Sequence, residues 1–438
     1  MNKFFTRRNV ENFTVFFLTL AFLMYATRDA LSGAMRYYFD LLHIGFVWFL
    51  IDITAFIAFI IFAFQQIWVR KNLYGIWVTV CFIFSLAVSL LTTNDTMVGF
   101  FSSIKMFAPM FIGLALGGVA VEQKRWVMNF LRFIFIATII GLLLNPHVDY
   151  PWLGQEIEVF GVTREATRLW WVSGGIVRYG GFAGDSTMAS YFIVFLFTML
   201  SRHHSLMTNL SCLPFAFWAI NTTTSKTAMG VMVVSVALYL LDYCIRNKAI
   251  SVFLLRSSAR LSFLCLLVPP LLMLLVGGMD LGSISGNLLS LQDRINNTWS
   301  GPFIVMADMF PVTMFTGCGL GCFTYPMFYT SYGHLMIPLD NFYLVTFLMM
   351  GFPILFYFYS MYRSASFSVD ISKLQMMTIF NIYAVTVQCY GPSFATLMVG
   401  YIFSDIFALR FKEETRGRLA KKVGSFSSRF EKAEVRPT

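Results

Sequence analysis

The sequence is poor in charged residues for its length. Only 12% of its 438 residues are Asp, Glu, Lys or Arg, whereas 58% are hydrophobic and the mean hydropathy is +0.70. A soluble domain carries about twice that charged fraction. Because a chain of this composition cannot shield its apolar surface from water, we expect a lipid bilayer to be its solvent. This composition excludes a soluble enzyme or a soluble binding module.

The sequence also lacks the residue spacings that bind metals. Its seven cysteines lie mostly inside apolar runs, where cysteine acts as a small apolar residue, and none shows metal-ligand spacing. We therefore expect no metal and no other cofactor. Cys318 and Cys322 share one loop, where we expect two free thiols, with a disulfide as the alternative.

The run GCGLGC at residues 317–322 superficially resembles a nucleotide-binding loop. No predicted strand or βαβ unit surrounds it, so we do not expect it to bind ATP. Its glycines are instead expected to allow a tight turn or a close approach of two backbones.

About twelve apolar segments approach the ~20 residues that a membrane-spanning helix needs. We therefore predict an all-α polytopic membrane protein with one transmembrane domain over residues 1–409. No internal repeat or low-complexity stretch divides it. The expected spans are residues 12–27, 41–64, 74–92, 97–121, 126–144, 187–200, 206–221, 228–242, 261–278, 341–362, 374–390 and 393–409.

The positions of lysine and arginine predict how the chain crosses the membrane. With the N-terminus inside, cytoplasmic segments before residue 409 hold 14 of these residues, and the opposite side receives seven. The basic tail 410–438 adds nine more and is expected to rest on anionic headgroups. Both termini are therefore predicted to be cytoplasmic. Because topology explains the net charge of +10, we expect no nucleic-acid partner.

Two connections on the outer side are long, at about residues 145–186 and 279–340, and they contain cations that run against the charge rule. Arg178 stands in RYGGF, directly before an expected span, and the functional interpretation is an anion site. Gly180 and Gly181 would let the backbone N–H groups approach a ligand, and the arginine fork suits phosphate oxygens. The alternative is an ion pair with Asp185.

Two further cations lie on the predicted outer side. In residues 287–299, Leu288, Leu291, Ile295 and Trp299 share one helical face, and Arg294 lies beside that face. We expect an interfacial helix whose polar side points into a wet cavity, or else an ordinary solvated face. Lys226 lies in the hydroxyl-rich segment NTTTSKT. Arg28 and Arg36 have Asp29 and Asp40 nearby and are expected to be loop residues.

The candidate acid and base groups are His334 and Asp340, in the segment SYGHLMIPLDNFYL before the expected tenth span. Either side chain can accept a proton from a hydroxyl group. For Asp340 the alternative role is to cap the N-terminus of that span. A cap does not exclude a second role.

These features resemble the O-antigen polymerase and O-antigen ligase superfamily of bacterial envelope glycosyltransferases. The resemblance rests on RYGGF, TTSKT at 223–227, the spacing from Arg294 to Trp299, Pro311, GCGLGCF at 317–323 and DNFYL at 340–344 followed by Gly351. These segments cover about the second half of the chain in the family order. Lys226 stands where members often have arginine, and Asp340 stands where ligases usually have histidine, which favours the polymerase.

The resemblance implies a reaction on the periplasmic face of the bacterial inner membrane. Donor and acceptor would be glycans carried on undecaprenyl pyrophosphate, and partners would include a chain-length regulator and a flippase. Arg178, Arg294, Lys226, Gly180 and Gly181 would bind the pyrophosphate. Asp340 or His334 would be the catalytic base, and the acceptor side would include Asn341, Tyr343 and Trp299.

Two other functions stay open at this point. The first is an O-antigen ligase, which transfers the finished polymer to lipid A–core. The second belongs to another class: a flippase or other transporter of lipid-linked oligosaccharide. A transporter is expected to place ionisable residues within several spans, and Asp52, Lys105, Arg132 and Asp405 are scattered candidates.

Overall fold

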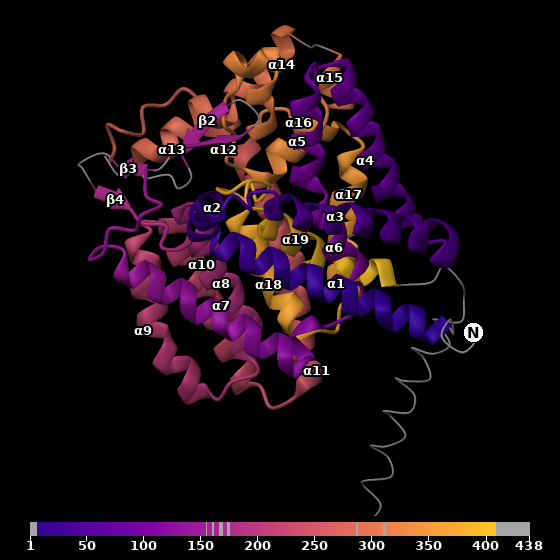
Figure 1. The fold of residues 1–438 in the computed structure, drawn as a ribbon, viewed down its shortest axis with the longest axis vertical. Coiled ribbons are helices and arrows are strands. Elements are labelled where there is room, and N and C mark those ends of the chain that lie inside the picture. Colours follow the sequence, from indigo (N-terminus) through magenta and orange to yellow (C-terminus); the bar gives the residue numbers. More distant parts are fainter. Residues whose placement is uncertain are drawn as a thin grey trace, which may run out of the picture.

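A computed structural model describes residues 7–154, 156–159, 162–165, 170–172, 176–285, 288–309 and 312–408. The fold is predominantly helical, as predicted, and it adds two small antiparallel hairpins (Figure 1). One hairpin pairs β1 (Glu156–Val159) with β2 (Val162–Glu165), and the other pairs β3 (Trp170–Val172) with β4 (Ile176–Arg178). The predicted basic tail at 410–438 and Pro311 lie outside the described residues.

Seven helical segments are long and apolar enough to cross a membrane, and each matches one of the twelve expected spans. The chain therefore has the helices of a membrane protein. The segments are α1 (Arg7–Ala30), α3 (Val47–Phe64) with η1 (Gln65–Arg70), α4 (Leu73–Leu91), α5 (Met97–Phe107) with α6 (Pro109–Ala115), α7 (Arg125–Leu144), α10 (Lys226–Cys244), and α11 (Lys248–Leu261) with η3 (Ser262–Leu267) and α12 (Val268–Val276).

The remaining expected spans correspond to shorter or interrupted helices. They are α8 (Ser186–Ser201), α9 (Leu206–Thr222), α16 (Phe342–Met350), α17 (Ile354–Phe367), α18 (Ile371–Tyr383) and α19 (Ser393–Ile402). Gly351, at φ 61°, separates α16 from α17 within the expected span 341–362. The helix expected to begin at residue 261 begins earlier, at Lys248, so its apolar part continues a basic helix.

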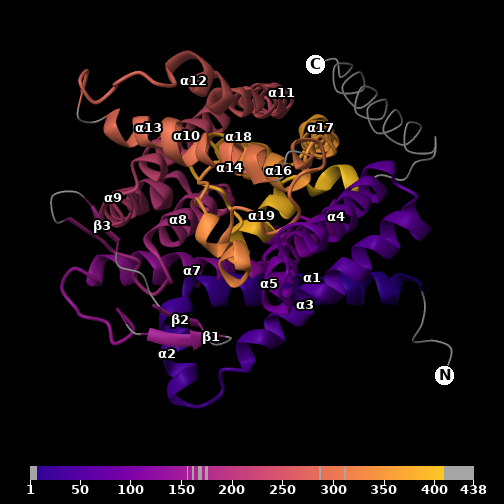
Figure 2. The ribbon, with the colours of Figure 1, turned by 90° about the horizontal axis from the view of Figure 1, so that it is seen from above.

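Helices α8, α18 and α19 form the interior of the bundle. Nearly every residue of α8 and α18 is buried, as is most of α19. Figures 1 and 2 show α18 and α19 at the centre, with α1 and α3 on one side and α11 on the other. Helix α19 packs so closely on α6 that a Cβ atom at Gly113 or Gly400 would overlap the backbone of the other helix. Small residues allow such close crossings between apolar helices.

The bundle has two chemically different ends. At the first end, which we call the Asp340 end, Phe342 N donates to Ala384 O after α18, and Phe394 N of α19 donates to Asp29 in the last turn of α1. At the second, the Glu122 end, Arg70 donates to Phe407 O of η8 (Ser404–Ala408). Arg28 and Arg294 pair with Asp29 and Asp340 at the first end, whereas Arg70 and Lys373 contact η8 at the second.

The two long connections lie at the Asp340 end. The first carries the hairpins and follows α7, whereas short helical segments build the second. These segments are α13 (Leu289–Asp293), η5 (Arg294–Trp299), α14 (Gly301–Met309), α15 (Thr313–Thr316), η6 (Tyr325–Tyr329) and η7 (Ser331–Leu335). The predicted helix over 287–299 is confirmed for its described residues, and Ile295 and Trp299 on its apolar face are buried.

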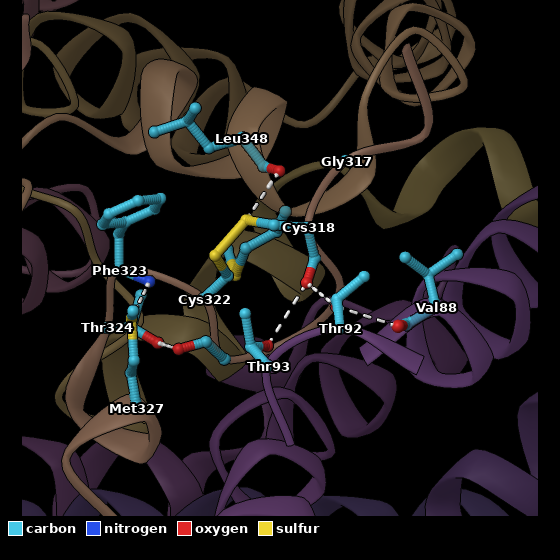
Figure 3. Close-up of a disulfide and its surroundings, with 12 residues drawn as sticks. Val88, Thr92, Thr93, Gly317, Cys318, Cys322, Phe323, Thr324, Met327 and Leu348 are labelled. Atoms are coloured by element: carbon cyan, nitrogen blue, oxygen red, sulfur yellow. Dashed lines mark hydrogen bonds between the residues drawn. A yellow bond between two sulfur atoms is a disulfide. The ribbon is translucent and has the colours of Figure 1, made fainter. Parts of the chain in front are cut away.

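The GCGLGC loop is closed by a disulfide between Cys318 and Cys322 (Figure 3). The expectation of two free thiols is therefore wrong. The loop lies between α4 and α16: Cys318 N donates to Leu348 O at 2.8 Å, and the Thr92 hydroxyl donates to Cys318 O at 2.7 Å. The predicted role of the glycines is confirmed, because Gly319 has φ 88° and lies against the backbone of Ser89. Close packing of loop and helices, which a local pattern does not reveal, brings the two sulfur atoms together.

Four charged side chains meet between α1, α3 and α5, where the sequence suggested only scattered charges. Arg28 Nη1 lies 2.5 Å from Asp52 Oδ1, and Lys105 Nζ lies 2.8 Å from Asp52 Oδ2. Arg28 Nε also pairs with Asp29 at 3.1 Å, and Asp29 accepts the N–H of Phe394 at 2.6 Å. The expectation that Arg28 is a loop residue is wrong, because it is 1% exposed on α1. We call this set the Arg28 cluster.

A second buried cluster lies at the Glu122 end. Glu122, in η2 (Val121–Gln123), accepts the hydroxyl of Tyr401 at 2.6 Å, and Tyr401 OH accepts Val121 N at 3.1 Å. Nearby, Lys373 Nζ pairs with Asp405 at 2.6 Å. Burial, and next the charge of Asp370, raise the pKa of Glu122 to about 7. No local pattern marks Glu122, because its neighbours Tyr401 and Asp370 come from segments about 250 residues or more away along the chain.

The Gly319 turn generates a stability prediction. In Gly319→Ala, the alanine must keep a left-handed backbone conformation, which costs about 1–2 kcal/mol. Its Cβ atom would also overlap the backbone of Ser89. Gly278→Ala is the matched control, because Gly278 has φ 83° and open space around it. Thermal melting in detergent should show a much larger loss for Gly319→Ala. Equal losses would contradict the close packing of the loop.

Glu122 generates a prediction about pH. A folded-state pKa raised above the unfolded value means that the folded state holds the proton more tightly. Its stabilising effect is therefore complete below about pH 4.5 and is lost as the pH rises through about 7. The loss amounts to about 3 kcal/mol at most. The purified protein should melt at a lower temperature at pH 8 than at pH 5.5.

In Glu122→Gln the difference in melting temperature between these pH values should shrink, because the amide does not titrate. Asp308→Asn, which changes an exposed carboxylate, is the control and should keep the difference. An unchanged pH dependence in Glu122→Gln would show that another group carries it.

Candidate functional site at the Asp340 end

The clearest constellation joins Asp340 to two side chains of η5. Arg294 Nε donates to Asp340 Oδ2 at 2.6 Å, and Trp299 Nε1 donates to Asp340 Oδ1 at 2.8 Å. The structure thus brings together three residues that the sequence assigned to different roles. Trp299 is fully buried, whereas the side chains of Arg294 and Asp340 are 31% and 32% exposed. A ligand in solution can therefore reach the ion pair, but it cannot reach the tryptophan.

The π-helical turn of η5 explains why one carboxylate receives both donors. Arg294 and Trp299 are five residues apart, which is the hydrogen-bond spacing of a π-helix. Ile295 and Trp299 are buried and fix this turn against the protein. Such single π-turns within helices are frequent at functional sites.

Asn341, and not Asp340, caps α16. Asn341 Oδ1 accepts Leu344 N at 2.8 Å, so the alternative in which Asp340 caps the span is wrong. The Asn341 side chain also donates to Val385 O at 2.6 Å. The cap therefore ties the start of α16 to the end of α18 and leaves the Asp340 carboxylate facing η5.

Lys226 is exposed at the first turn of α10, whose N-cap is Ser225. Its neighbour Thr227 lies 2.8 Å from Thr386, hydroxyl to hydroxyl. Because Thr386 follows Val385, which binds Asn341, the TTSKT segment and the DNFYL segment both contact the end of α18. Val385 and Thr386 were not predicted as site residues, because they lie in an apolar run and no local pattern shows that they contact Asn341 and Thr227.

Arg178 ends β4 and is half-buried. The N–H of the following Tyr179 donates to Thr222 O at the end of α9, which places RYGGF beside TTSKT. The Nε atom of Arg178 is buried without a hydrogen-bond partner in the described part of the chain. Asp185 accepts Met188 N at 2.7 Å as the N-cap of α8, and no ion pair between Arg178 and Asp185 occurs among the described residues.

The two glycines after Arg178 pack against protein. Gly181, at φ 64°, donates its N–H to Asn145 at 3.0 Å, and a Cβ there would press on the backbone of α7. Gly180 is buried, and its carbonyl accepts Ala183 N. The expectation that Gly181 offers its N–H to a ligand is therefore wrong for this structure. Both glycines instead fix the turn that carries Arg178.

His334 and Tyr343 form hydrogen bonds with residues other than Asp340. His334 is exposed in η7, where its Nδ1 contacts Ser331 O at 3.0 Å, and no hydrogen bond in the described residues joins it to Asp340. Tyr343 is buried and donates to Asn381 of α18 at 2.7 Å. Among the predicted acid and base groups, the structure therefore favours Asp340 as the group beside a cation.

The site thus consists of one carboxylate paired with one arginine, plus two further cations on segments joined to it by hydrogen bonds. Arg294, with a partly exposed planar fork, suits the oxygen atoms of an anion. Asp340 supplies a carboxylate beside that fork. This combination is suited to binding an anionic group beside a group that accepts a proton.

Comparison with known proteins gives no match, whether to a family model, a curated protein sequence or a solved structure. The resemblance therefore rests on the motifs themselves and on their placement.

The contact between TTSKT and the end of α18 is open to a direct test. With the five free cysteines replaced and the native disulfide kept, Thr227→Cys with Thr386→Cys should crosslink under mild oxidation, because their hydroxyls are 2.8 Å apart. Thr208→Cys with Thr386→Cys is the matched control, since Thr208 lies at the other end of α9. The assay is the gel shift after alkylation of free thiols. Equal crosslinking of both pairs would contradict the arrangement.

Proposed function

We propose that the protein is a membrane polysaccharide polymerase of the bacterial inner membrane. In this proposal it joins oligosaccharide repeat units carried on undecaprenyl pyrophosphate into O-antigen or a related surface polymer. The observation that carries the proposal is the Asp340–Arg294 pair, which places a candidate base beside a candidate pyrophosphate ligand. The Asp340 end would be the periplasmic end, and both termini would be cytoplasmic.

The proposed reaction is a single displacement at the anomeric carbon of the donor. Asp340 takes the proton from a hydroxyl of the acceptor sugar, and that oxygen forms the new glycosidic bond. The bond from the anomeric carbon to the pyrophosphate oxygen breaks, and its electron pair leaves with the lipid pyrophosphate. One such attack inverts the anomeric configuration. Asp340 afterwards returns its proton to water.

The cations would act on the leaving group. Negative charge grows on the pyrophosphate as the bond breaks, and preorganised donors placed there lower the barrier. Arg294 and Arg178 offer guanidinium groups, and Lys226 offers a single ammonium. The buried, unpartnered Nε of Arg178 supports this role, since such a donor gains free energy from an acceptor.

A ligase remains the second candidate within the class, with the same donor and lipid A–core as acceptor. A transporter is the candidate from another class. The Arg28 cluster is the observation in its support, since charges buried between spanning helices often mark transport pathways. The Arg28 cluster also has a structural role, because Asp29 holds the first turn of α19. Polymerisation fits the partly exposed site better.

The glycan profile of cells that lack the gene tests the proposal. Loss of the polymer ladder with single capped repeats remaining is expected for a polymerase. Loss of all capping would indicate a ligase, and repeats accumulating on the cytoplasmic leaflet would indicate a flippase. Complementation with Arg178→Lys or Arg294→Lys should restore little polymer at normal protein abundance, because a lost charged hydrogen bond is worth roughly 1.5–3 kcal/mol.

Asp185→Asn is the matched control, because asparagine also caps helices well and α8 should remain intact. This variant should make nearly normal polymer. Polymer length on a gel is compared with protein abundance on a membrane immunoblot for each variant. Normal polymer from both Arg178→Ala and Arg294→Ala would end the pyrophosphate-site proposal.

A further inference from the structure

We infer that Asp340 and the donor anion compete for Arg294, so that binding of the anion releases Asp340 to act as a base. The inference deepens the proposed function and rests on it for the identity of the anion. It starts from a conflict in the geometry. The group that should accept a proton is held by the cation that should bind the leaving group.

The ion pair is placed so that an anion can displace it. Arg294 Nε lies 2.6 Å from Asp340 Oδ2, and about a third of each side chain is exposed. Ion pairs in partly exposed positions contribute little free energy, because water solvates both partners. A pyrophosphate group carries more charge than one carboxylate and can bind the guanidinium through two parallel hydrogen bonds. The anion therefore has the advantage in the exchange.

Trp299 keeps Asp340 in place after the exchange. Its Nε1 donates to the other carboxylate oxygen at 2.8 Å, and its ring is fully buried. Asn341 holds the next residue through its bonds to Leu344 N and Val385 O. Asp340 thus loses its arginine without losing its orientation.

The consequence is that donor binding and activation of the base are one event. Without donor, Asp340 Oδ2 stays paired with Arg294 and is not free to receive the acceptor hydroxyl. With donor, Arg294 turns to the pyrophosphate, and Asp340 Oδ2 becomes available for the acceptor hydroxyl. In the opposite arrangement, Asp340 would keep its bond to Arg294 Nε and hold the side chain in position while the two Nη atoms of Arg294 bind the anion. The two arrangements predict opposite effects of removing the carboxylate.

The test measures binding of inorganic pyrophosphate to the purified full-length protein, in EDTA, by calorimetry. If the exchange occurs, Asp340→Asn should bind pyrophosphate about three- to tenfold more tightly than the unmodified protein, because no carboxylate competes. If Asp340 positions Arg294, the same variant should bind more weakly, and that result would overturn the inference. Asp340→Ser replaces it if the asparagine variant is not monodisperse.

Asp293→Asn is the matched control for charge. Asp293 adjoins Arg294 in the chain but accepts a hydrogen bond from Asn297, so its loss removes one negative charge without freeing Arg294. It should tighten binding much less than Asp340→Asn. In an Arg294→Ala background, Asp340→Asn should no longer tighten binding. Equal effects of the two aspartate variants, or an effect that persists without Arg294, would overturn the exchange.

Failure of the exchange differs from failure of the proposed function. Pyrophosphate that binds the unmodified protein, but not more tightly to Asp340→Asn, refutes the exchange and leaves the polymerase proposal standing. Absence of any binding that depends on Arg294 refutes the pyrophosphate site and the exchange with it.

Discussion

The side chain of Asn341 holds the candidate site together. One side-chain atom caps α16, and another reaches Val385 at the end of α18, so two helices that meet at one end of the bundle are fixed by a single residue. Asp340 precedes it and takes its position from it. Thr386, next to Val385, contacts Thr227, so the segment with Lys226 depends on the same junction. The site therefore exists only when α16, α18 and α10 are packed.

Polar contacts of α18 with α16, α11 and η3 continue this junction along the bundle. Tyr343 donates to Asn381, Asn381 donates to Ser262, and Thr378 contacts Ser258 further along α18. Polar side chains taken out of water must find partners, and hydrogen bonds between helices satisfy them in an apolar bundle. Helix α18 thus carries a line of small polar contacts from the Asp340 end toward Lys373. Its burial makes it the rigid element on which the site is built.

Two sets of charged groups at the Asp340 end differ in their burial and therefore in their roles. Arg28, Asp29 and Asp52 of the Arg28 cluster are almost fully buried, and removing one of these partners costs about 3–5 kcal/mol because the other charge stays behind. Its connection to the first turn of α19 gives it a structural role. The Arg294–Asp340 pair is partly exposed and therefore cheap to break. A pair that is cheap to break is suited to a site where an incoming ligand changes partners.

Local patterns were sufficient for some features. Seven of the twelve spans predicted from the apolar runs are helices long enough to cross a membrane, and the spacing of Leu288, Leu291, Ile295 and Trp299 predicted a helix on which Ile295 and Trp299 are buried. These features depend on residues close together in the chain. Such short-range periodicity is visible without knowledge of the fold.

Only the tertiary structure decided the partners. Asp340 and Arg294 are 46 positions apart, Asp29 and Phe394 are 365 apart, and Glu122 and Tyr401 are 279 apart. Which helix lies against which depends on how whole surfaces pack, and no local spacing records that choice. The sequence therefore identified Asp340, Arg294 and Trp299 as candidates one by one. The packing of η5 against the start of α16 made one site of them, because it brought two donors to the two oxygens of one carboxylate.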